Sequence, residues 1–216
     1  MTKGPFQLIN VILALSDFLM NLQKHAKDEG YMLPDRLKWN QKYKTDSLPD
    51  APSSVVKQFF KLAGGKKALD IAAGNGRNAL FLADQGFAVD AVDISDAGLN
   101  LFAGKHVNVQ PICADLDNFD IPPNQYDLII NIKFLSRRLF PFIREGLNRG
   151  GILIFQTFLD LPDGGEEQPL CRDYRLQENE LLHAFLSLKI LFYNEGKEKS
   201  HNDAPHLATL VAVRIS

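Results

Sequence analysis

Between residues 53 and 157 the sequence alternates short apolar runs with stretches of helical character. Strand-length apolar runs occur at 67–71, 87–92, 107–112, 126–132 and 151–157. Helical stretches are expected at 54–63, 76–85, from Ser95 to about 103, and at 135–147. Short, nearly continuous apolar strands separated by helices are typical of a parallel sheet covered on both faces. The sequence therefore predicts a doubly wound α/β fold.

The C-terminal part departs from this alternation. After a helix expected at 179–186, strands at 188–194 and 206–213 follow each other with no helix-forming stretch between them. The connection at 195–205 is polar and contains Gly, Asn and Pro, which favours a loop between antiparallel strands. We therefore expect a mostly parallel, seven-stranded sheet that ends in an antiparallel hairpin.

The N-terminal quarter lies outside the α/β pattern. Apolar residues at three- and four-residue spacing predict an amphipathic helix over 6–24. Residues 25–52 are a polar connection with at most a short helix around Trp39 to Tyr43. A chain of 216 residues suits one domain with an extension. We divide it into an N-terminal helix and connector (1–52) and one domain (53–216), and expect the helix to cover the ligand cleft or form a dimer contact.

Composition narrows the partners and the compartment. The 24 Lys and Arg residues are balanced by 26 Asp and Glu, so the chain lacks the basic excess that binds nucleic acid. Cys113 and Cys171 stand far apart, outside any metal-ligand pattern, as in proteins of a reducing compartment. The apolar run at 11–15 is too short for a signal peptide or a membrane span. We expect a cytoplasmic protein without metal, membrane or nucleic-acid partners.

The segment most informative about function is the turn after the first strand. Residues 69–79 read Leu-Asp-Ile-Ala-Ala-Gly-Asn-Gly-Arg-Asn-Ala. Glycines there let a ligand approach the backbone and meet the free N–H groups of the following helix. Gly74, Gly76 and Ala79 also fit the GxGxxA pattern of dinucleotide sites, with Asp93 placed to bind a ribose. The turn alone is therefore compatible with a NAD-dependent oxidoreductase, or with a tight turn that serves only packing.

Acidic residues follow three successive predicted strands. Asp70 would repel a pyrophosphate but attract a ligand that carries an ammonium and a sulfonium. Asp93 can accept hydrogen bonds from two ribose hydroxyls, and Asp115 can accept one from an adenine amino group while Leu116 packs on the ring. A solvated acidic loop is the alternative for Asp115. The three acids favour a ligand with a cationic end and a ribose diol.

The run from Leu69 to Ser95 resembles motif I and the following ribose-binding acid of class I S-adenosylmethionine (SAM)-dependent methyltransferases. It is most similar to their tellurite-resistance-type branch, in which a Gly-Asn-Gly-Arg-Asn turn recurs. The resemblance extends over about 39–214, with matching segments at 39–43, 126–129, 135–137, 147–151, 179–182 and 207–212. It implies a Rossmann-like fold, SAM as the cofactor and methyl transfer as the activity.

Carried over residue by residue, the resemblance implies a set of cofactor-binding positions. These are Asp70, Ala72, Gly74, Gly76, Asn78, Asp93, Ile94, Asp115, Leu116 and Asn131. Ala72 departs from the family motif, which has Gly at this place. If the position requires a positive φ, the Ala side chain costs on the order of 1 kcal/mol.

Methyl transfer is an in-line displacement at a carbon that the sulfonium already activates. The enzyme mainly holds the acceptor about 3 Å from the methyl group, and a general base is needed only for a protonated acceptor. Tyr43, Arg137, His201 and His206 are candidate acceptor-side residues, because their segments converge at the carboxyl edge of the sheet. Each has a structural alternative, which for Arg137 is a solvated position at a helix start.

The sequence also bears on the acceptor. Residues 131–134 read Asn-Ile-Lys-Phe and lack the Pro pair of amino-methylating nucleic-acid enzymes. Cys113 lies in the wrong place for the nucleophile of a cytosine C5 enzyme. A small-molecule acceptor is therefore expected, such as tellurite, selenite, a thiol or a metabolite. A NAD-dependent oxidoreductase and a non-catalytic SAM-binding protein stay as alternatives, and both a monomer and a homodimer are compatible with the sequence.

Overall fold

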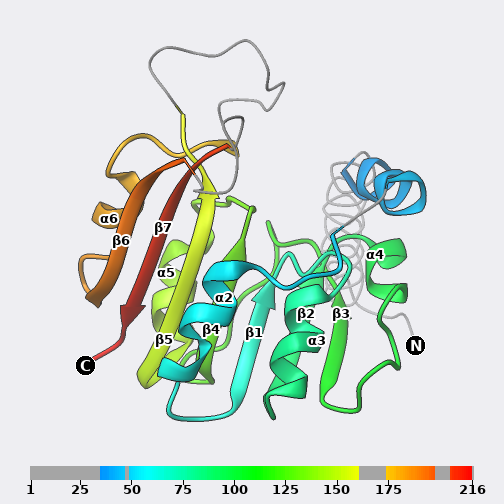
Figure 1. Cartoon of the computed structure of the whole chain (residues 1–216), viewed down its shortest axis with the longest axis horizontal. Coiled ribbons are helices and arrows are strands. Elements are labelled where there is room, and N and C mark those ends of the chain that lie inside the picture. Colours follow the sequence, from blue (N-terminus) through cyan, green and yellow to red (C-terminus); the bar gives the residue numbers. More distant parts are fainter. Residues whose placement is uncertain (1–34, 47–48, 161–173, 198–204, 216) are drawn as a thin grey trace, which may run out of the picture.

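The computed structural model describes residues 35–46, 49–160, 174–197 and 205–215. The amphipathic helix predicted over 6–24, Cys171 and His201 lie outside these residues. Seven strands form one sheet in the order β3-β2-β1-β4-β5-β7-β6 (Figure 1). Their bounds are β1 Lys67–Ile71, β2 Ala88–Asp93, β3 Val109–Cys113, β4 Tyr126–Ile132, β5 Leu147–Phe158, β6 Lys189–Lys197 and β7 His206–Val213.

The pairing of the strands confirms the predicted topology. The pairs β1–β2, β1–β4, β2–β3 and β4–β5 are parallel. In contrast, β7 is antiparallel to both β5 and β6 and lies between them. The sheet is thus mostly parallel and doubly wound, with an antiparallel hairpin of β6 and β7 at one edge.

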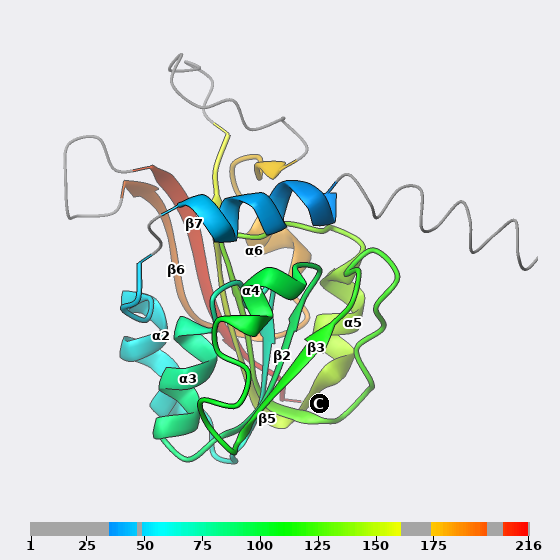
Figure 2. The same cartoon turned by 90° about the vertical axis from the view of Figure 1, so that its right-hand side faces the viewer.

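Helices cover both faces of the sheet, so its strands can be apolar on both sides. Viewed from the side, α2 and α3 lie on one face and α5 on the other (Figure 2). The helices are α2 Ser54–Phe59, η1 Phe60–Leu62, α3 Arg77–Asp84, α4 Asp96–Asn100, α5 Leu139–Gly146 and α6 Glu180–Ala184. One core cluster joins α2, α3 and α4 to the sheet, and the other joins α5 and α6 to it.

Two helices differ from their predicted extent by several residues at their start, and α4 ends at Asn100 instead of about 103. The helix expected at 135–147 begins only at Leu139. Before it, the Asn131 side-chain amide donates to the Phe134 carbonyl at 2.7 Å, and Lys133 adopts a φ of 60°, so the chain turns after β4 instead of continuing into a helix. The second difference is a helix over 35–45, where only a short one was expected, and its polar side chains bond to α4. No described helix is long and apolar enough to cross a membrane.

Candidate functional site

Asp70 is a buried acid near the carboxyl end of β1. Only 1% of its surface is exposed, and its Oδ2 atom has no hydrogen-bond partner among the described residues. Burial raises the pKa of Asp70 to about 8, and the nearby Asp93 adds to this effect, while Arg77 and the Ala79 backbone oppose it. A buried carboxylate with an unbonded oxygen is unfavourable in water-free surroundings. A cationic group placed beside Asp70 would remove that penalty.

Asp93 ends β2 on the same face of the sheet as Asp70. The two are neighbours because Asp70 pairs with Ala91, two residues before Asp93. The Asp93 Oδ1 atom accepts from the Ser95 backbone N–H and Oδ2 accepts from the Gly74 backbone N–H, both at 2.8 Å. Burial raises the pKa of Asp93, and backbone N–H donors lower it in part. Asp93 thus ties the turn after β1 to the turn after β2, and its oxygens keep further acceptor capacity.

The turn between β1 and α3 adopts left-handed backbone conformations that favour glycine. Gly74 has a φ of 61° and Gly76 a φ of 75°. A Cβ on Gly76 would come within 2.3 Å of the Phe102 ring, so this position also requires the absence of a side chain. Ala72 has a φ of 54°, and the strain that its Cβ was expected to bring is therefore present.

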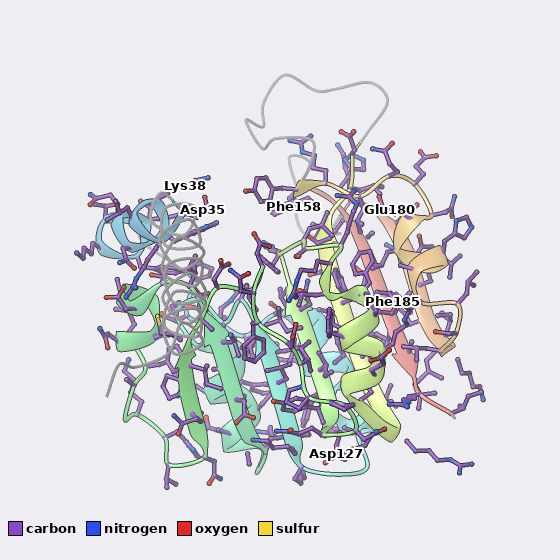
Figure 3. The ribbon with its side chains drawn as sticks, turned by 180° about the vertical axis from the view of Figure 1, so that it is seen from behind. Asp35, Lys38, Asp127, Phe158, Glu180 and Phe185 are labelled. Atoms are coloured by element: carbon purple, nitrogen blue, oxygen red, sulfur yellow. The ribbon has the colours of Figure 1, made fainter. Side chains whose placement is uncertain are left out.

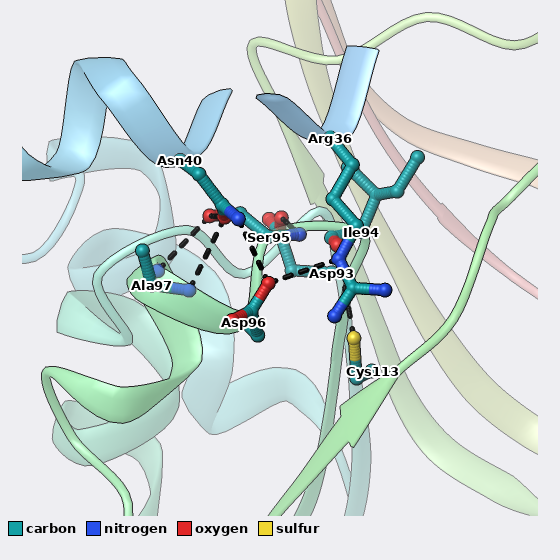
Figure 4. A network of polar contacts seen from close by, with 9 residues as sticks. Arg36, Asn40, Asp93, Ile94, Ser95, Asp96, Ala97 and Cys113 are labelled. Carbon is teal, nitrogen blue, oxygen red and sulfur yellow. Dashed lines mark hydrogen bonds and ion pairs between the residues drawn. The ribbon is translucent and has the colours of Figure 1, made fainter. Parts of the chain in front are cut away.

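The helix over 35–45 lies above the start of α4 and is joined to it by a polar network (Figure 4). The Asn40 Oδ1 atom accepts from the Ser95 hydroxyl at 2.6 Å and from the Ala97 backbone N–H at 3.2 Å. The Asn40 amide and the Arg36 Nε atom both donate to Asp96, at 2.8 and 2.9 Å. Ser95 caps α4 by accepting from the Gly98 N–H, as predicted.

Tyr43 projects from the same helix onto the glycine turn. A Cβ on Gly74 would lie 2.6 Å from the Tyr43 hydroxyl oxygen, and a Cβ on Gly98 would lie 3.0 Å from its ring. Burial raises the pKa of Tyr43 well above its usual value, and the charges of Asp93 and Asp70 raise it further. Tyr43 was expected on the acceptor side of the site, and the structure places it against the turn that follows β1.

Three further residues predicted to bind the cofactor hydrogen-bond to other parts of the protein. Asn78 is buried, and its Oδ1 accepts from the Ser53 backbone N–H at 2.9 Å, joining α3 to the segment before α2. Asn131 is buried and closes the turn after β4. Ile94 is half-buried, and its carbonyl accepts from the Cys113 thiol at 3.7 Å.

The loop after β3 carries Asp115 and Leu116. The Asp115 carboxylate accepts from the Asp117 backbone N–H and from the Asn118 side-chain amide, each at 3.0 Å. Asp115 is half-buried, and Leu116 is only 5% exposed and belongs to the core cluster under α5. The loop is therefore ordered by its own side chains, with Asp115 at its centre.

Two other acceptor-side candidates, Arg137 and His206, lie among the described residues at the carboxyl edge. Arg137 makes two contacts with Glu180 of α6, at 2.5 and 2.9 Å, and also donates to the Arg175 carbonyl at 2.9 Å. His206 is half-buried at the start of β7, next to the end of β5. Seen from behind, Glu180 and Phe158 stand on one side of this edge, and Lys38 of the helix over 35–45 stands on the other (Figure 3). No group of three metal-ligating side chains occurs among the described residues.

Asn40, Arg36 and Ser53 were missed as contributors to this site. Asn40 lies 55 residues before Ser95, and Ser53 lies 25 residues before Asn78. No local spacing marks such contacts. The only signal available for Asn40 was its place in the segment 39–43 that matches the family.

Comparison with known proteins gives the same class as the fold and the site. Residues 68–151 match the family described as "Methyltransferase domain". The chain is 29% identical over 200 residues to the probable S-adenosyl-L-methionine-dependent methyltransferase TehB of Haemophilus influenzae strain Rd, covering 87% of this chain and 65% of TehB. TehB of strain 10810 is 30% identical, with the same coverage. The chain thus spans about two thirds of the length of these relatives.

Solved structures agree on the fold. The crystal structure of TehB from Haemophilus influenzae matches with a TM-score of 0.63 at 24% identity, covering 82% of this chain and 65% of that one. The [4+2]-cyclase SpnF matches with a TM-score of 0.60 at 18% identity, covering 74% and 78%. The chain is thus similar to SAM-dependent methyltransferases and contains a segment that matches a methyltransferase domain. The similarity to TehB extends over most of the chain in both sequence and structure.

Proposed function

We propose that this protein transfers a methyl group from SAM to a small-molecule nucleophile by in-line displacement. The observation that carries the proposal is the buried Asp70, whose Oδ2 atom has no hydrogen-bond partner in the described part of the chain. Its neighbour on the sheet is a second acid, Asp93. Two buried acids at adjoining strand ends favour a cation and disfavour a pyrophosphate. This pair therefore supports SAM over NAD as the ligand.

The residues present fit SAM along its length. Asp70 would face the cationic methionine end above the turn at Gly74 and Gly76, and Asp93 would accept from the ribose hydroxyls. Asp115 would accept from the adenine amino group, beside Ile94 and Leu116, if its carboxylate exchanges one of its loop hydrogen bonds. When bound, SAM supplies a methyl group that its sulfonium activates for displacement.

The contribution of Tyr43 follows from the place of its hydroxyl over Gly74. A phenol of raised pKa stays protonated at neutral pH, so Tyr43 acts as a hydrogen-bond donor and not as a general base. Its place over Gly74 directs the hydroxyl toward the methionine end of the cofactor. The proposed role of Tyr43 is to hold and shield that end of SAM.

The proposed acceptor is a small nucleophile such as tellurite, selenite, a thiol or a metabolite. Arg137 is already paired with Glu180, so we assign it to the wall of the acceptor site and not to a free anion receptor. His206, at the start of β7, stands at the same edge and is a candidate base for protonated acceptors. We keep the division into 1–52 and 53–216, and the cytoplasmic location, as parts of this proposal.

Binding tests the cofactor assignment directly. Titration calorimetry with SAM and with S-adenosylhomocysteine should show saturable binding that Asp93→Ala weakens strongly. NADH serves as the competing ligand, and binding of NADH without S-adenosylhomocysteine would contradict the proposal. Formation of S-adenosylhomocysteine is then measured with tellurite, selenite and thiols as acceptors. Production with any acceptor excludes a purely non-catalytic SAM-binding protein.

A further inference from the structure

The acid that ends β2 is held by a chain of hydrogen bonds that begins outside the α/β domain. The Asn40 Oδ1 atom accepts from the Ser95 hydroxyl at 2.6 Å, and the Ser95 backbone N–H donates to Asp93 Oδ1 at 2.8 Å (Figure 4). Ser95 thus connects Asn40 to the Asp93 carboxylate.

Asn40 uses each part of its amide in this arrangement. Its oxygen accepts from the Ser95 hydroxyl and from the Ala97 N–H, and its nitrogen donates to Asp96. An amide at this position therefore fastens three consecutive residues at the start of α4. A helix of five residues contributes little order of its own, so this start depends on such outside contacts.

The rest of the helix over 35–45 is placed to keep Asn40 in register. Arg36, one turn earlier, donates to the same Asp96 oxygen at 2.9 Å. Tyr43, about one turn later, packs against Gly98 and Gly74, where a Cβ would approach it within 3.0 and 2.6 Å. Contacts at both ends thus hold the helix against the turn that precedes α4.

We propose that Asn40 is a positioning residue, which orients Asp93 toward the ribose of the cofactor through Ser95. The inference rests on the proposed function, because it assigns the ribose to Asp93. Asn40 itself touches neither the cofactor nor the acceptor in this proposal. Replacing Asn40 should therefore weaken the binding of the ribose hydroxyls and have little effect on the binding of the rest of the ligand.

The test compares S-adenosylhomocysteine with its 2′-deoxy analogue, which lacks one ribose hydroxyl. Wild-type protein should bind the complete ligand more tightly than the analogue. Asn40→Ala should lower the affinity for S-adenosylhomocysteine by about three- to tenfold, as expected for one misplaced hydrogen bond. It should lower the affinity for the analogue much less. Gln41→Ala, an exposed neighbour on the same helix, is the matched control and should bind both ligands as wild type does.

A rescue experiment separates positioning from loss of folding. Asn40→Asp keeps the acceptor for Ser95 but sets a carboxylate against Asp96, so it should weaken binding. Adding Asp96→Asn restores a donor and an acceptor between the two positions and should recover the wild-type preference for the ribose hydroxyl. Equal weakening of both ligands by Asn40→Ala, or no recovery in the double variant, would overturn the inference. Failure of wild-type protein to bind S-adenosylhomocysteine would instead overturn the proposed function, and this inference with it.

Discussion

The hydroxyl of Tyr43 lies over Gly74, so close that a Cβ on that glycine would come within 2.6 Å of the phenolic oxygen. Gly74 also has a φ of 61°, which an L side chain rarely adopts. Two separate physical reasons therefore require glycine at this position, and substitutions can measure them one at a time.

Gly74→Ala should destabilise the protein by more than the approximately 1–2 kcal/mol that a left-handed alanine costs, because the contact with Tyr43 adds to it. Removing the hydroxyl with Tyr43→Phe leaves a nearest ring carbon at 3.4 Å, an ordinary contact. Gly74→Ala should thus cost less in the Tyr43→Phe background, as measured by urea unfolding. Gly86→Ala is the control, since Gly86 has a φ of 85° and open space around it. Equal costs in both backgrounds would show that the two residues do not meet.

Ala72→Gly should relieve backbone strain in the turn after β1. The left-handed conformation of Ala72 costs about 1–2 kcal/mol, while the greater freedom of glycine in the unfolded chain costs about 0.4–1 kcal/mol. Ala73, next to it, is buried without a positive φ, so Ala73→Gly gains no such relief. The Ala72→Gly protein should be more stable than the Ala73→Gly protein by about 1–2 kcal/mol in thermal unfolding. The reverse order would contradict the strain at Ala72.

Asp70 should make stability and SAM binding depend on pH in opposite directions. Its pKa is raised from 3.8 to about 8, so between these values the folded protein holds a proton that the unfolded chain has lost. Stability of the SAM-free protein should therefore fall as the pH rises through this window. A cation beside Asp70 favours the carboxylate, so SAM binding near pH 7 should release a proton and tighten as the pH rises toward 8.

Proton release is measured by calorimetry in two buffers of different ionisation enthalpy. Asp70→Asn keeps the size of the side chain and has no proton to lose, so the buffer dependence attributable to this site should disappear. Its unfolding free energy should also vary less between pH 5 and 8 than that of wild type. An unchanged proton release in Asp70→Asn would show that another group is responsible.

The pair of Arg137 and Glu180 should contribute modestly to stability. Burial opposes ionisation of Glu180, but the Arg137 guanidinium lowers its pKa below the usual value. The contribution is thus present at neutral pH and is lost as the pH falls through this lowered pKa. Arg137→Lys loses the two-point contact and should cost less than about 1 kcal/mol, since the Arg137 side chain is 43% exposed.

Arg138→Lys is a matched control for that substitution. Arg138 pairs with Asp120 at 2.7 Å, and the Asp120 side chain is 68% exposed. Arg138→Lys should therefore lower the free energy of unfolding in urea at pH 7 by less than Arg137→Lys does. The same proteins also test the role given to Arg137, because affinity for S-adenosylhomocysteine should be unchanged in both. A marked loss of affinity in Arg137→Lys would place Arg137 at the cofactor.

The parallel strands were predictable because a strand that is buried on both faces consists of a nearly continuous run of apolar residues. For example, β4 begins and ends where the sequence indicated. The predicted start of α5 was wrong: Leu135 lies one helical turn before Leu139 and extends the apolar spacing, but the side-chain hydrogen bond from Asn131 to the Phe134 carbonyl turns the chain just before Leu135. In the site, Asp70, Asp93 and the two glycines follow from local sequence. The contacts of Asn40 and Asn78 do not, because their partners lie tens of residues away along the chain.

The placement of β7 between β5 and β6 sets an order for assembly. Until residues 206–213 are available, β5 has a bare edge and β6 has no neighbour to pair with. During synthesis, which proceeds from the N-terminus, the parallel strands can therefore associate first, with an apolar edge at β5 that other chains can join. Pairing with β7 covers that edge of β5. A chain shortened before residue 206 would therefore leave the ribosome with the edge exposed and would tend to aggregate.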